Sequence, residues 1–344
     1  MTDTILPLFG LRPEDFMIER IGSGHIHLTY KLEGQKNFIL QRVNKNVFRQ
    51  PELIASNLRM ASDYLSRTCP DYNFLTCIRS VSGKEMEYDA EGFPWRLFPF
   101  IGNTITIDSV STKEQAFHAA SEFARLTRKL EGINVQGFRP TIPRFHDLTM
   151  RWEQFEDACS NDTHMSEARE LVDACKRAYP LVDMYRTLTA PGMMPLRIVH
   201  NDTKINNVLF DRVTGSTSGV IDLDTLMPGY ILYDLGDMVR TFVSPVSEEE
   251  RSLDKISFRK EIYDALLEGY LSEMGPVMTE VERRAIPLAG PMMTYIMALR
   301  FLADFLRGNV YYHISYPEQN LVRASNQLRL LDVLSKNIKG AAVY

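Results

Sequence analysis

The sequence has few cysteines and no excess of positive charge. Four cysteines stand among 344 residues, without the Cys-x-x-Cys spacing of a metal site or the density of a secreted disulfide scaffold. We therefore expect reduced thiols. The chain has 39 lysines and arginines against 44 aspartates and glutamates, so its net charge is -5. Because no basic stripe is available for a nucleic-acid backbone, we expect no nucleic-acid partner and favour a small soluble one.

Long apolar runs are also missing. The longest uncharged stretch, residues 285–299, is shorter than the roughly 20 residues that span a bilayer, and two prolines interrupt it. We interpret it as a buried core segment. The first sixteen residues, MTDTILPLFGLRPEDF, lack the basic start and long apolar stretch of a signal peptide. These features predict a cytoplasmic protein with no membrane partner, and the 44% hydrophobic content is enough to build two cores.

The first hundred residues have the pattern of a small sheet with one helix. Residues 16–45 alternate as strand, glycine turn, strand, turn and strand, which predicts an antiparallel meander. Pro51 then stands where a helix can begin, because a missing N–H costs nothing at the first helical position. Residues 74–82 and 93–101 read as two further strands.

After Gly102 the pattern becomes helical. Residues 113–132 carry a broad apolar stripe at helical spacing, closed by a glycine. Further helices are predicted at 148–160, 164–188, 255–274, 281–307 and 318–337, and only three short segments between 197 and 224 resemble strands. The fold class is therefore α+β, divided into residues 1–101 and residues 102–344.

The acidic residues around these short strands form the most informative pattern. His200, Asp202 and Asn207 give H-x-D-x-x-x-x-N, in which an Asp orients a substrate hydroxyl and an Asn holds a metal ion on the phosphates. A predicted turn at 215–219 would bring Asp222 back beside Asn207, so that both oxygens face one Mg²⁺. The alternative is a chance match among ordinary turn and capping residues. The joint occurrence of loop, strand, turn, strand and Asp favours a metal–nucleotide site.

The segment IGSGHIHLTY is a weaker signal for the same chemistry. Gly22 and Gly24 would let backbone N–H groups approach phosphates, as a glycine-rich kinase loop does. The third glycine of G-x-G-x-x-G is missing, since His27 stands in its place, and a plain hairpin turn is the alternative. The downstream site favours the nucleotide loop.

A family resemblance extends these motifs over nearly the whole chain. The stretches HNDTKINNVLF and GVIDLDTLMPGYILYDLGDMVR resemble the aminoglycoside phosphotransferase and choline kinase superfamily, and most closely its N-acetylhexosamine 1-kinases. The similarity continues through residues 140–148 and 298–331. It implies a two-lobed, protein-kinase-like fold that uses ATP and Mg²⁺, with a small β-rich nucleotide-binding lobe before a larger, mainly α-helical catalytic and substrate-binding lobe.

The resemblance also assigns roles to the residues of the catalytic loop. It implies that Asp202 is the base toward a sugar hydroxyl and that Asn207 and Asp222 are the Mg²⁺ ligands. His200 would brace the loop, and Asp234, near a helix start, would tether it from below; both roles are structural.

The acceptor site follows from the same resemblance. Asp224 and Thr225 are similar to family positions that line the acceptor pocket. Arg300 and Tyr311 match residues that contact the sugar in the N-acetylhexosamine branch. An aromatic ring can bury the C–H face of a pyranose, whereas a packed corner between a helix and a loop is the alternative for Tyr311.

The nucleotide site departs from the usual kinase pattern at one position. Where many kinases carry a phosphate-binding lysine on the third strand, this chain has Gln41 and Arg42, and strand alternation lets only one of them face the nucleotide. Residues 95–102, which include Phe98 and Phe100, resemble the hinge whose backbone pairs with adenine.

These observations predict an ATP-dependent kinase that phosphorylates the anomeric hydroxyl of an N-acetylhexosamine. One alternative is a kinase of another small acceptor, such as an aminoglycoside, choline or homoserine. Cationic acceptors call for a ring of carboxylates, which the segment of Arg300 and Tyr311 matches poorly. The other alternative is a pseudokinase that binds nucleotide and acts as a partner-binding module. The sequence leaves the oligomeric state open and is compatible with a monomer.

Overall fold

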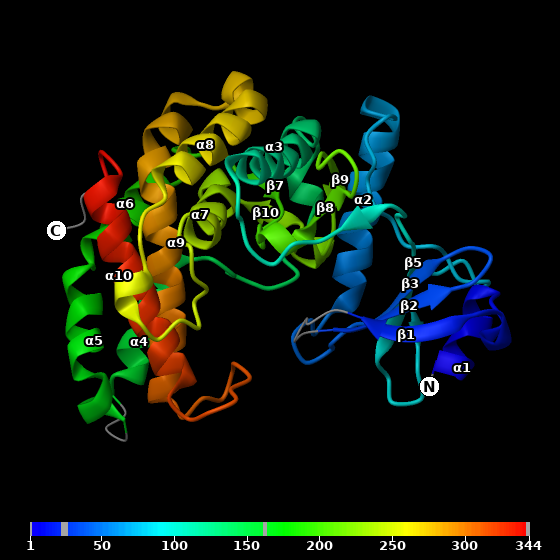
Figure 1. The fold of residues 1–344 in the computed structure, drawn as a ribbon, viewed down its shortest axis with the longest axis horizontal. Coiled ribbons are helices and arrows are strands. Elements are labelled where there is room, and N and C mark those ends of the chain that lie inside the picture. Colours follow the sequence, from blue (N-terminus) through cyan, green and yellow to red (C-terminus); the bar gives the residue numbers. More distant parts are fainter. Residues whose placement is uncertain (1, 22–26, 161–163, 342–344) are drawn as a thin grey trace. The chain divides into compact units, whose positions relative to one another are not determined.

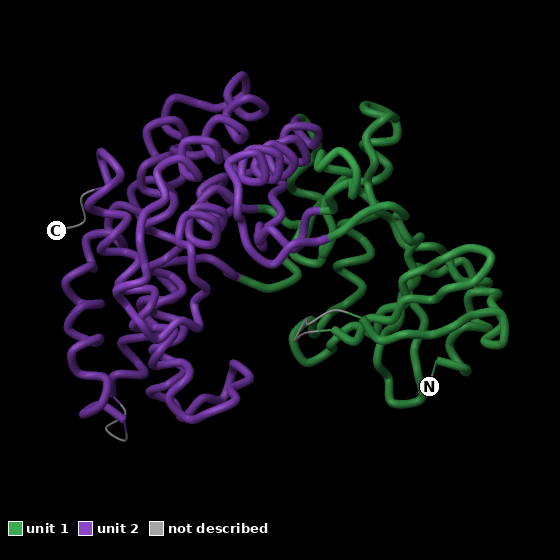
Figure 2. The backbone as a smooth tube through the Cα atoms, viewed as in Figure 1, with its two compact units in different colours: residues 1–105, 132–143, 209–228 green, residues 106–131, 144–208, 229–344 purple. Residues whose placement is uncertain are grey.

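The computed structural model describes residues 2–21, 27–160 and 164–341 (Figure 1). The fold is α+β, with a β-rich N-terminal sheet and a helical C-terminal region, as predicted. Two compact units can be separated (Figure 2). Unit 1 contains Met1–Ile105, Gly132–Pro143 and Leu209–Pro228, and unit 2 contains Thr106–Glu131, Arg144–Val208 and Gly229–Tyr344. Both units are therefore built from interleaved segments, whereas the boundary predicted after residue 101 separates two consecutive ones.

The main sheet of unit 1 has five strands in the order β1-β2-β3-β5-β4. Their bounds are Met17–Ile21 (β1), Leu28–Glu33 (β2), Phe38–Arg42 (β3), Glu87–Tyr88 (β4) and Pro94–Pro99 (β5). All the pairs are antiparallel, which confirms the predicted meander and the strand expected at 93–101. Leu32, Leu40, Trp95 and Leu97 form its core together with residues of the short helix α1, Thr2–Ile5, and of the turn that follows.

The strand predicted at residues 74–82 is wrong. Only Ile78 makes a β-bridge, to Leu97. Beyond it the backbone turns, because the N–H of Ser80 donates to the carbonyl of Lys84 and the N–H of Gly83 donates to that of Ser80. These local bonds replace the ladder that an extended strand would need.

Helix α2, Pro51–Thr68, begins at its proline as predicted. Its buried Asn57 connects the three segments of unit 1. The amide Nδ2 donates to the carbonyls of Arg139 (2.8 Å) and Leu226 (3.0 Å), and Oδ1 accepts the N–H of Arg139 (3.1 Å). One side chain thus satisfies backbone groups of both later segments.

A second sheet contains β6, β8 and β9, in that order. The strands are Thr104–Ile105 (β6), Val208–Asp211 (β8) and Thr217–Val220 (β9). Asp211 closes the hairpin between β8 and β9, since its carboxylate accepts the N–H groups of Val213 (2.9 Å) and Thr214 (2.8 Å). The predicted return of the chain is confirmed, but the turn lies at residues 212–216 and not at 215–219, because β9 already begins at Thr217.

Unit 2 is built mainly from helices. They are α3 (Lys113–Lys129), α4 (Leu148–Ala158), α5 (Met165–Arg177), α6 (Pro180–Leu188), α7 (Ile231–Phe242), α8 (Lys260–Met274), α9 (Glu280–Leu306) and α10 (Gln319–Asn337). Helix α9 packs against α4, α5, α7 and α10, and α3 packs against α8. Strand β7 (Arg197–Val199) belongs to this unit, whereas β10 (Met227–Gly229) lies where the chain passes from unit 1 to unit 2.

Two helix predictions need correction, one in its middle and one at its start. The helix expected at 164–188 is divided into α5 and α6, because Pro180 cannot donate a backbone hydrogen bond and instead begins a new helix. The helix expected at 255–274 begins only at Lys260. The helices predicted at 148–160, 281–307 and 318–337 are present within a few residues of those bounds.

Among the described residues, α9 is the one helix long and apolar enough to cross a membrane. Most of the relevant stretch, 72%, is buried inside the protein. Thr279 and Glu282 form a capping box at its start, and Ala285 and residues 289–299 are buried, in agreement with the predicted core segment. Burial of this kind is typical of a core helix.

Candidate active site

The loop that follows β7 in unit 2 is held by the first turn of α7. The carboxylate of Asp234 accepts the N–H groups of His200 (2.9 Å) and Asn201 (2.7 Å), and its carbonyl accepts the hydroxyl of Thr203 (2.7 Å). Asp234 is 1% exposed, and burial raises its pKa to about 6, although His200 and the two N–H groups oppose the shift. Asp234 therefore ties the loop after β7 to the first turn of α7.

Asn201 makes the bend that precedes Asp202. Its φ of 65° lies in the left-handed region, which asparagine tolerates better than most residues. Its Nδ2 donates to the carbonyl of Val199 (3.1 Å), and its own carbonyl lies 2.8 Å from Nε2 of His146. The bend is therefore fixed from both sides.

Asp202 and Asn207 meet within this loop. Nδ2 of Asn207 donates to the carbonyl of Asp202 (2.9 Å) and to its Oδ2 (3.3 Å), while Nζ of Lys204 lies 3.2 Å from Oδ1. Burial alone would raise the pKa of Asp202, but Lys204 and then His200 outweigh it and lower the pKa. Asp202 is therefore ionised at neutral pH. The sequence analysis had not singled out Lys204.

Asp222 and Asp224 lie in unit 1, directly after β9. Asp222 has a φ of 58° and is exposed, whereas Asp224 is 2% exposed. The two oxygens of Asp224 pair with Nε2 of His27 (2.8 Å) and Nη1 of Arg96 (2.5 Å). Burial opposes ionisation of Asp224, but these partners outweigh it and lower the pKa. Thr225 follows and is buried.

Arg96 was missed by sequence reasoning. It lies on β5 opposite Gln41 of β3, and its Nε donates to Oε1 of Gln41 (2.9 Å). Burial lowers the pKa of Arg96, whereas the charge of Asp224 raises it, and the net shift is upward. The buried cation of this sheet is therefore an arginine on β5. The sequence around Arg96 contains no pattern that would indicate Asp224 as its partner.

The predicted phosphate contacts on β3 have other partners. Nε2 of Gln41 donates to Thr29 (3.1 Å), and Arg42 pairs with Asp89 (2.9 Å) and Glu91 (2.6 Å). Successive side chains of a strand point to opposite faces of the sheet, which explains why Gln41 and Arg42 have different partners.

The predicted hinge segment begins on β5. The ring of Phe98 lies 5.0 Å from Cζ of Arg96, and Nζ of Lys31 lies 4.9 Å from the ring of Phe100. The predicted loop positions Gly22 and Gly24 lie outside the described residues.

The residues present fit a divalent metal unevenly. His27, Asp222 and Asp224 place ligand atoms within 4.8 Å of one another, but both oxygens of Asp224 already face cationic or N–H partners. An arginine at 2.5 Å would repel a second cation. The exposed carboxylate of Asp222 suits Mg²⁺, which prefers oxygen ligands. Asn207 uses its nitrogen toward Asp202, so its amide oxygen is the atom that a metal would take.

Arg300 and Tyr311 come together in unit 2. Cζ of Arg300 lies 5.2 Å from the ring centre of Phe145, 5.5 Å from that of Tyr312 and 5.9 Å from that of Tyr311. The carboxylate of Asp304 accepts the N–H groups of Tyr311 (2.8 Å) and Tyr312 (3.0 Å) and so fixes their loop. A guanidinium is therefore surrounded by three rings, one of them, Tyr311, 61% exposed.

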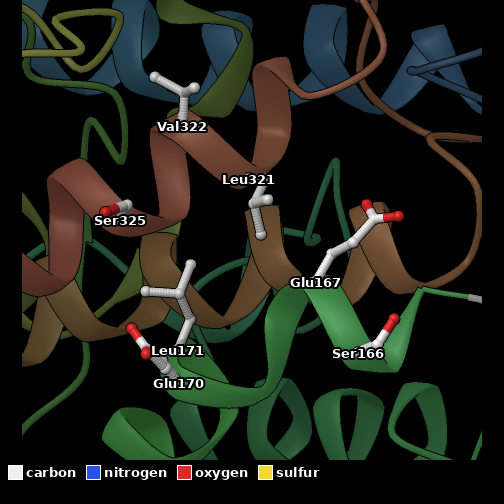
Figure 3. A pocket seen from close by; sticks show the side chains of 7 residues that line it. All are labelled: Ser166, Glu167, Glu170, Leu171, Leu321, Val322 and Ser325. Atoms are coloured by element: carbon white, nitrogen blue, oxygen red, sulfur yellow. The ribbon is translucent and has the colours of Figure 1, made fainter.

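A pocket elsewhere in unit 2 contains none of these residues. It has a volume of about 380 Å³ and lies between α5 and α10 (Figure 3). Its lining is formed by Ser166, Glu167, Glu170, Leu171, Leu321, Val322 and Ser325. Its lining contains no lysine, arginine or histidine that could bind a phosphate.

A family described as the phosphotransferase enzyme family matches residues 17–278, more than half of the chain. The chain belongs to this family. The matched range includes the loop of Asp202 and Asn207 and the turn of Asp222 and Asp224. The protein is thus a phosphotransferase, and the expected cofactors ATP and Mg²⁺ agree with the family.

Several solved structures share the fold of this phosphotransferase. The microcompartment-associated aminopropanol kinase is 18% identical over 100% of this chain and 99% of its own, with a TM-score of 0.63. Amicoumacin kinase in complex with AMP-PNP, Ca²⁺ and Ami is 14% identical over 96% and 92%, with a TM-score of 0.63. An aminoglycoside phosphotransferase from Alicyclobacillus acidocaldarius is 12% identical over 94% and 93%, also at 0.63. Identities this low show the fold alone.

Proposed function

We propose that this phosphotransferase transfers the γ-phosphoryl group of ATP to the anomeric hydroxyl of an N-acetylhexosamine. The observation that carries the proposal is the loop on which Asp202, Lys204 and Asn207 meet under the tether of Asp234. In phosphoryl transfer most of the catalysis is positioning and charge neutralisation, which such a fixed loop provides.

Asp202 would orient the acceptor hydroxyl and take its proton as the oxygen attacks the γ-phosphorus and ADP leaves. Its lowered pKa keeps it ionised, so it is ready to accept a hydrogen bond at neutral pH. Lys204 and Asn207 restrict the rotation of the carboxylate through their contacts at 3.2 and 3.3 Å. His200, whose Nδ1 accepts the N–H of Asp202 (3.2 Å), would brace the loop.

Asn207 and Asp222 would hold Mg²⁺ through their side-chain oxygens. The bound ion would neutralise charge on the phosphates. The β8–β9 hairpin, which joins these two residues in the chain, supports the pairing.

The nucleotide would be bound by Gly22 and Gly24, by Gln41 or Arg42 and by the backbone around Phe98 and Phe100. Arg42 would exchange its exposed partner Glu91 for a phosphate; the side chain of Glu91 is 63% exposed.

The charge around Arg300 favours a neutral acceptor over a cationic one. Nη2 of Arg151 donates to the carbonyl of Phe145 (2.6 Å), whose ring also faces Arg300. Burial and then the charge of Arg300 lower the pKa of Arg151 to about 10. Two guanidinium groups beside one phenylalanine would repel the ammonium groups of an aminoglycoside or of choline.

The remaining assignments concern the acceptor pocket and the cellular compartment. Asp224 and Thr225 would line the acceptor pocket, and Tyr311 would cover one face of the sugar. Both oxygens of Asp224 already pair with His27 and Arg96, so an acceptor hydroxyl would have to share one of these oxygens. We also propose that the enzyme works in the cytoplasm, without nucleic acid or membrane.

The test is phosphate transfer from Mg-ATP to N-acetylglucosamine, N-acetylgalactosamine, glucose, choline and kanamycin, with products located by ³¹P NMR. We expect an anomeric phosphate doublet with the acetamido sugars alone. Turnover with choline or kanamycin would overturn the acceptor and leave the roles of Asp202, Asn207 and Asp222. No turnover with any acceptor would favour the pseudokinase alternative.

A further inference from the structure

His146 is a buried histidine that the phosphotransfer chemistry does not itself require. It stands immediately before Asp147, whose side chain caps α4. Its side chain is 5% exposed, and its ring lies 4.1 Å from that of Phe145 and 5.3 Å from that of Tyr233. Its Nε2 lies 2.8 Å from the carbonyl oxygen of Asn201.

The hydrogen bonding defines the protonation state of His146. A carbonyl oxygen only accepts, so Nε2 must carry the proton and donate it. Nδ1 then has no proton, and it finds no hydrogen-bond partner among the residues that the structure describes. Burial lowers the pKa of His146 to about 3, despite the bond to Asn201. The ring is neutral at any pH at which the enzyme would be assayed.

The bond of His146 falls on the peptide that leads into Asp202. The carbonyl of Asn201 and the N–H of Asp202 belong to one planar group. His146 holds the oxygen of this plane, and Nδ1 of His200 accepts its N–H at 3.2 Å. Asp234 holds the N–H of Asn201, one plane earlier. His146 is thus a donor that reaches this plane from outside the β7 loop and α7.

We propose that His146 is a positioning residue for Asp202; the inference rests on the proposed function, in which Asp202 orients the acceptor hydroxyl. Asn201 is held in the left-handed region, which is less favourable for a residue with a Cβ, so its backbone can relax and turn the following peptide plane once the clamp is removed. Rotation of that plane moves the Cα–Cβ bond of Asp202 away from the acceptor. The neutral imidazole supplies a directed N–H without adding a positive charge that would compete for the carboxylate.

His146 also links this loop to the acceptor contacts. The preceding residue, Phe145, places its ring under Arg300 and gives its carbonyl to Arg151. One dipeptide therefore contacts the catalytic loop through His146 and the arginines through Phe145. A shift of this dipeptide would change both how Asp202 orients the acceptor hydroxyl and how Arg300 contacts the sugar.

The experiment compares His146→Gln, His146→Asn and His146→Leu with the wild type. The glutamine amide reaches as far as Nε2 and can donate to Asn201, the shorter asparagine amide does not reach, and leucine has no donor. We expect His146→Asn and His146→Leu to lower kcat about 10- to 100-fold, since small misplacements of catalytic groups have effects of this size. The KM for ATP should stay within about twofold, and His146→Gln should recover most of kcat. His118→Asn on α3 serves as the matched histidine control and should leave kcat unchanged.

A second readout does not depend on turnover. Hydrogen–deuterium exchange of a peptide covering residues 200–207 should speed up in His146→Asn and His146→Leu but not in His146→Gln or His118→Asn. Wild-type kcat in His146→Asn, or equal loss in all three His146 variants at unchanged exchange, would overturn the positioning role. If the wild type phosphorylates no acceptor, the proposed function fails, whereas the exchange pattern still decides whether His146 clamps the loop.

Discussion

The ionised carboxylate of Asp234, which holds the loop before Asp202, should oppose folding stability at neutral pH. Asp234 is buried, and its pKa in the folded protein is about 6, against an ordinary value of 3.8. A carboxyl group with a raised pKa binds its proton more tightly in the folded state. Its contribution is therefore fully present below pH 3.8 and is lost as the pH rises through 6.

The magnitude follows from the size of the shift. About two pKa units at 1.36 kcal/mol each amount to about 3 kcal/mol, lost mainly between pH 4 and 6. Asp234→Asn cannot ionise and should lack this pH dependence. Its amide also turns an N–H toward one of the two backbone donors, so at low pH the variant should be less stable than the wild type.

The assay is urea unfolding from pH 4 to 7.5, followed by the fluorescence of Trp152 in unit 2, in a Trp95→Phe background. The gap in unfolding free energy between wild type and Asp234→Asn should shrink by about 3 kcal/mol over this range. Asp183→Asn, at an exposed carboxylate on α6, is the control and should show a constant gap. A gap that stays constant for Asp234→Asn, or widens with rising pH, would refute the reasoning.

Three further predictions concern single side chains. Asp202→Asn should lower kcat about 10²- to 10⁴-fold while isothermal titration shows nucleotide binding within about twofold of wild type, and a near-normal rate would contradict its role. Asp222→Asn should shift the Mg²⁺ titration of activity to higher concentration; an unchanged curve would remove it from the metal site. Arg96→Met should lower the free energy of unfolding by about 3 to 5 kcal/mol, because it leaves the carboxylate of Asp224 buried without its cation. Trp95 fluorescence during urea unfolding measures this, and a loss below about 1 kcal/mol would show that His27 alone compensates.

The sequence was sufficient where the signal is local. The meander of β1 to β3, the proline start of α2 and the hairpin after Asn207 depend on alternation, a fixed φ and turn residues within a few positions. The contact of Asp202 with Asn207 is local too, since both lie on one short loop. The strand at 74–82 was predicted wrongly because its apolar residues resemble a strand pattern. In the structure a turn at Ser80 interrupts this segment.

Contacts between distant segments could not be predicted from one sequence. Arg96 meets Asp224 because β5 pairs with β3 and because a segment more than a hundred residues later belongs to the same unit. The two partners of Asp224, His27 and Arg96, lie 69 positions apart in the first segment of unit 1, and no periodicity in the sequence indicates either contact. The bond from His146 to Asn201 spans 55 positions and has no spacing signature either.

The interleaving of the two units limits how this protein can be divided or recombined. A fragment of residues 1–105 would keep the main sheet but lose the backbone partners of Asn57 and the carboxylate that neutralises Arg96. It would leave a buried cation and a buried amide unsatisfied. A chimera that exchanges unit 1 between relatives therefore has to transplant residues 1–105, 132–143 and 209–228 together.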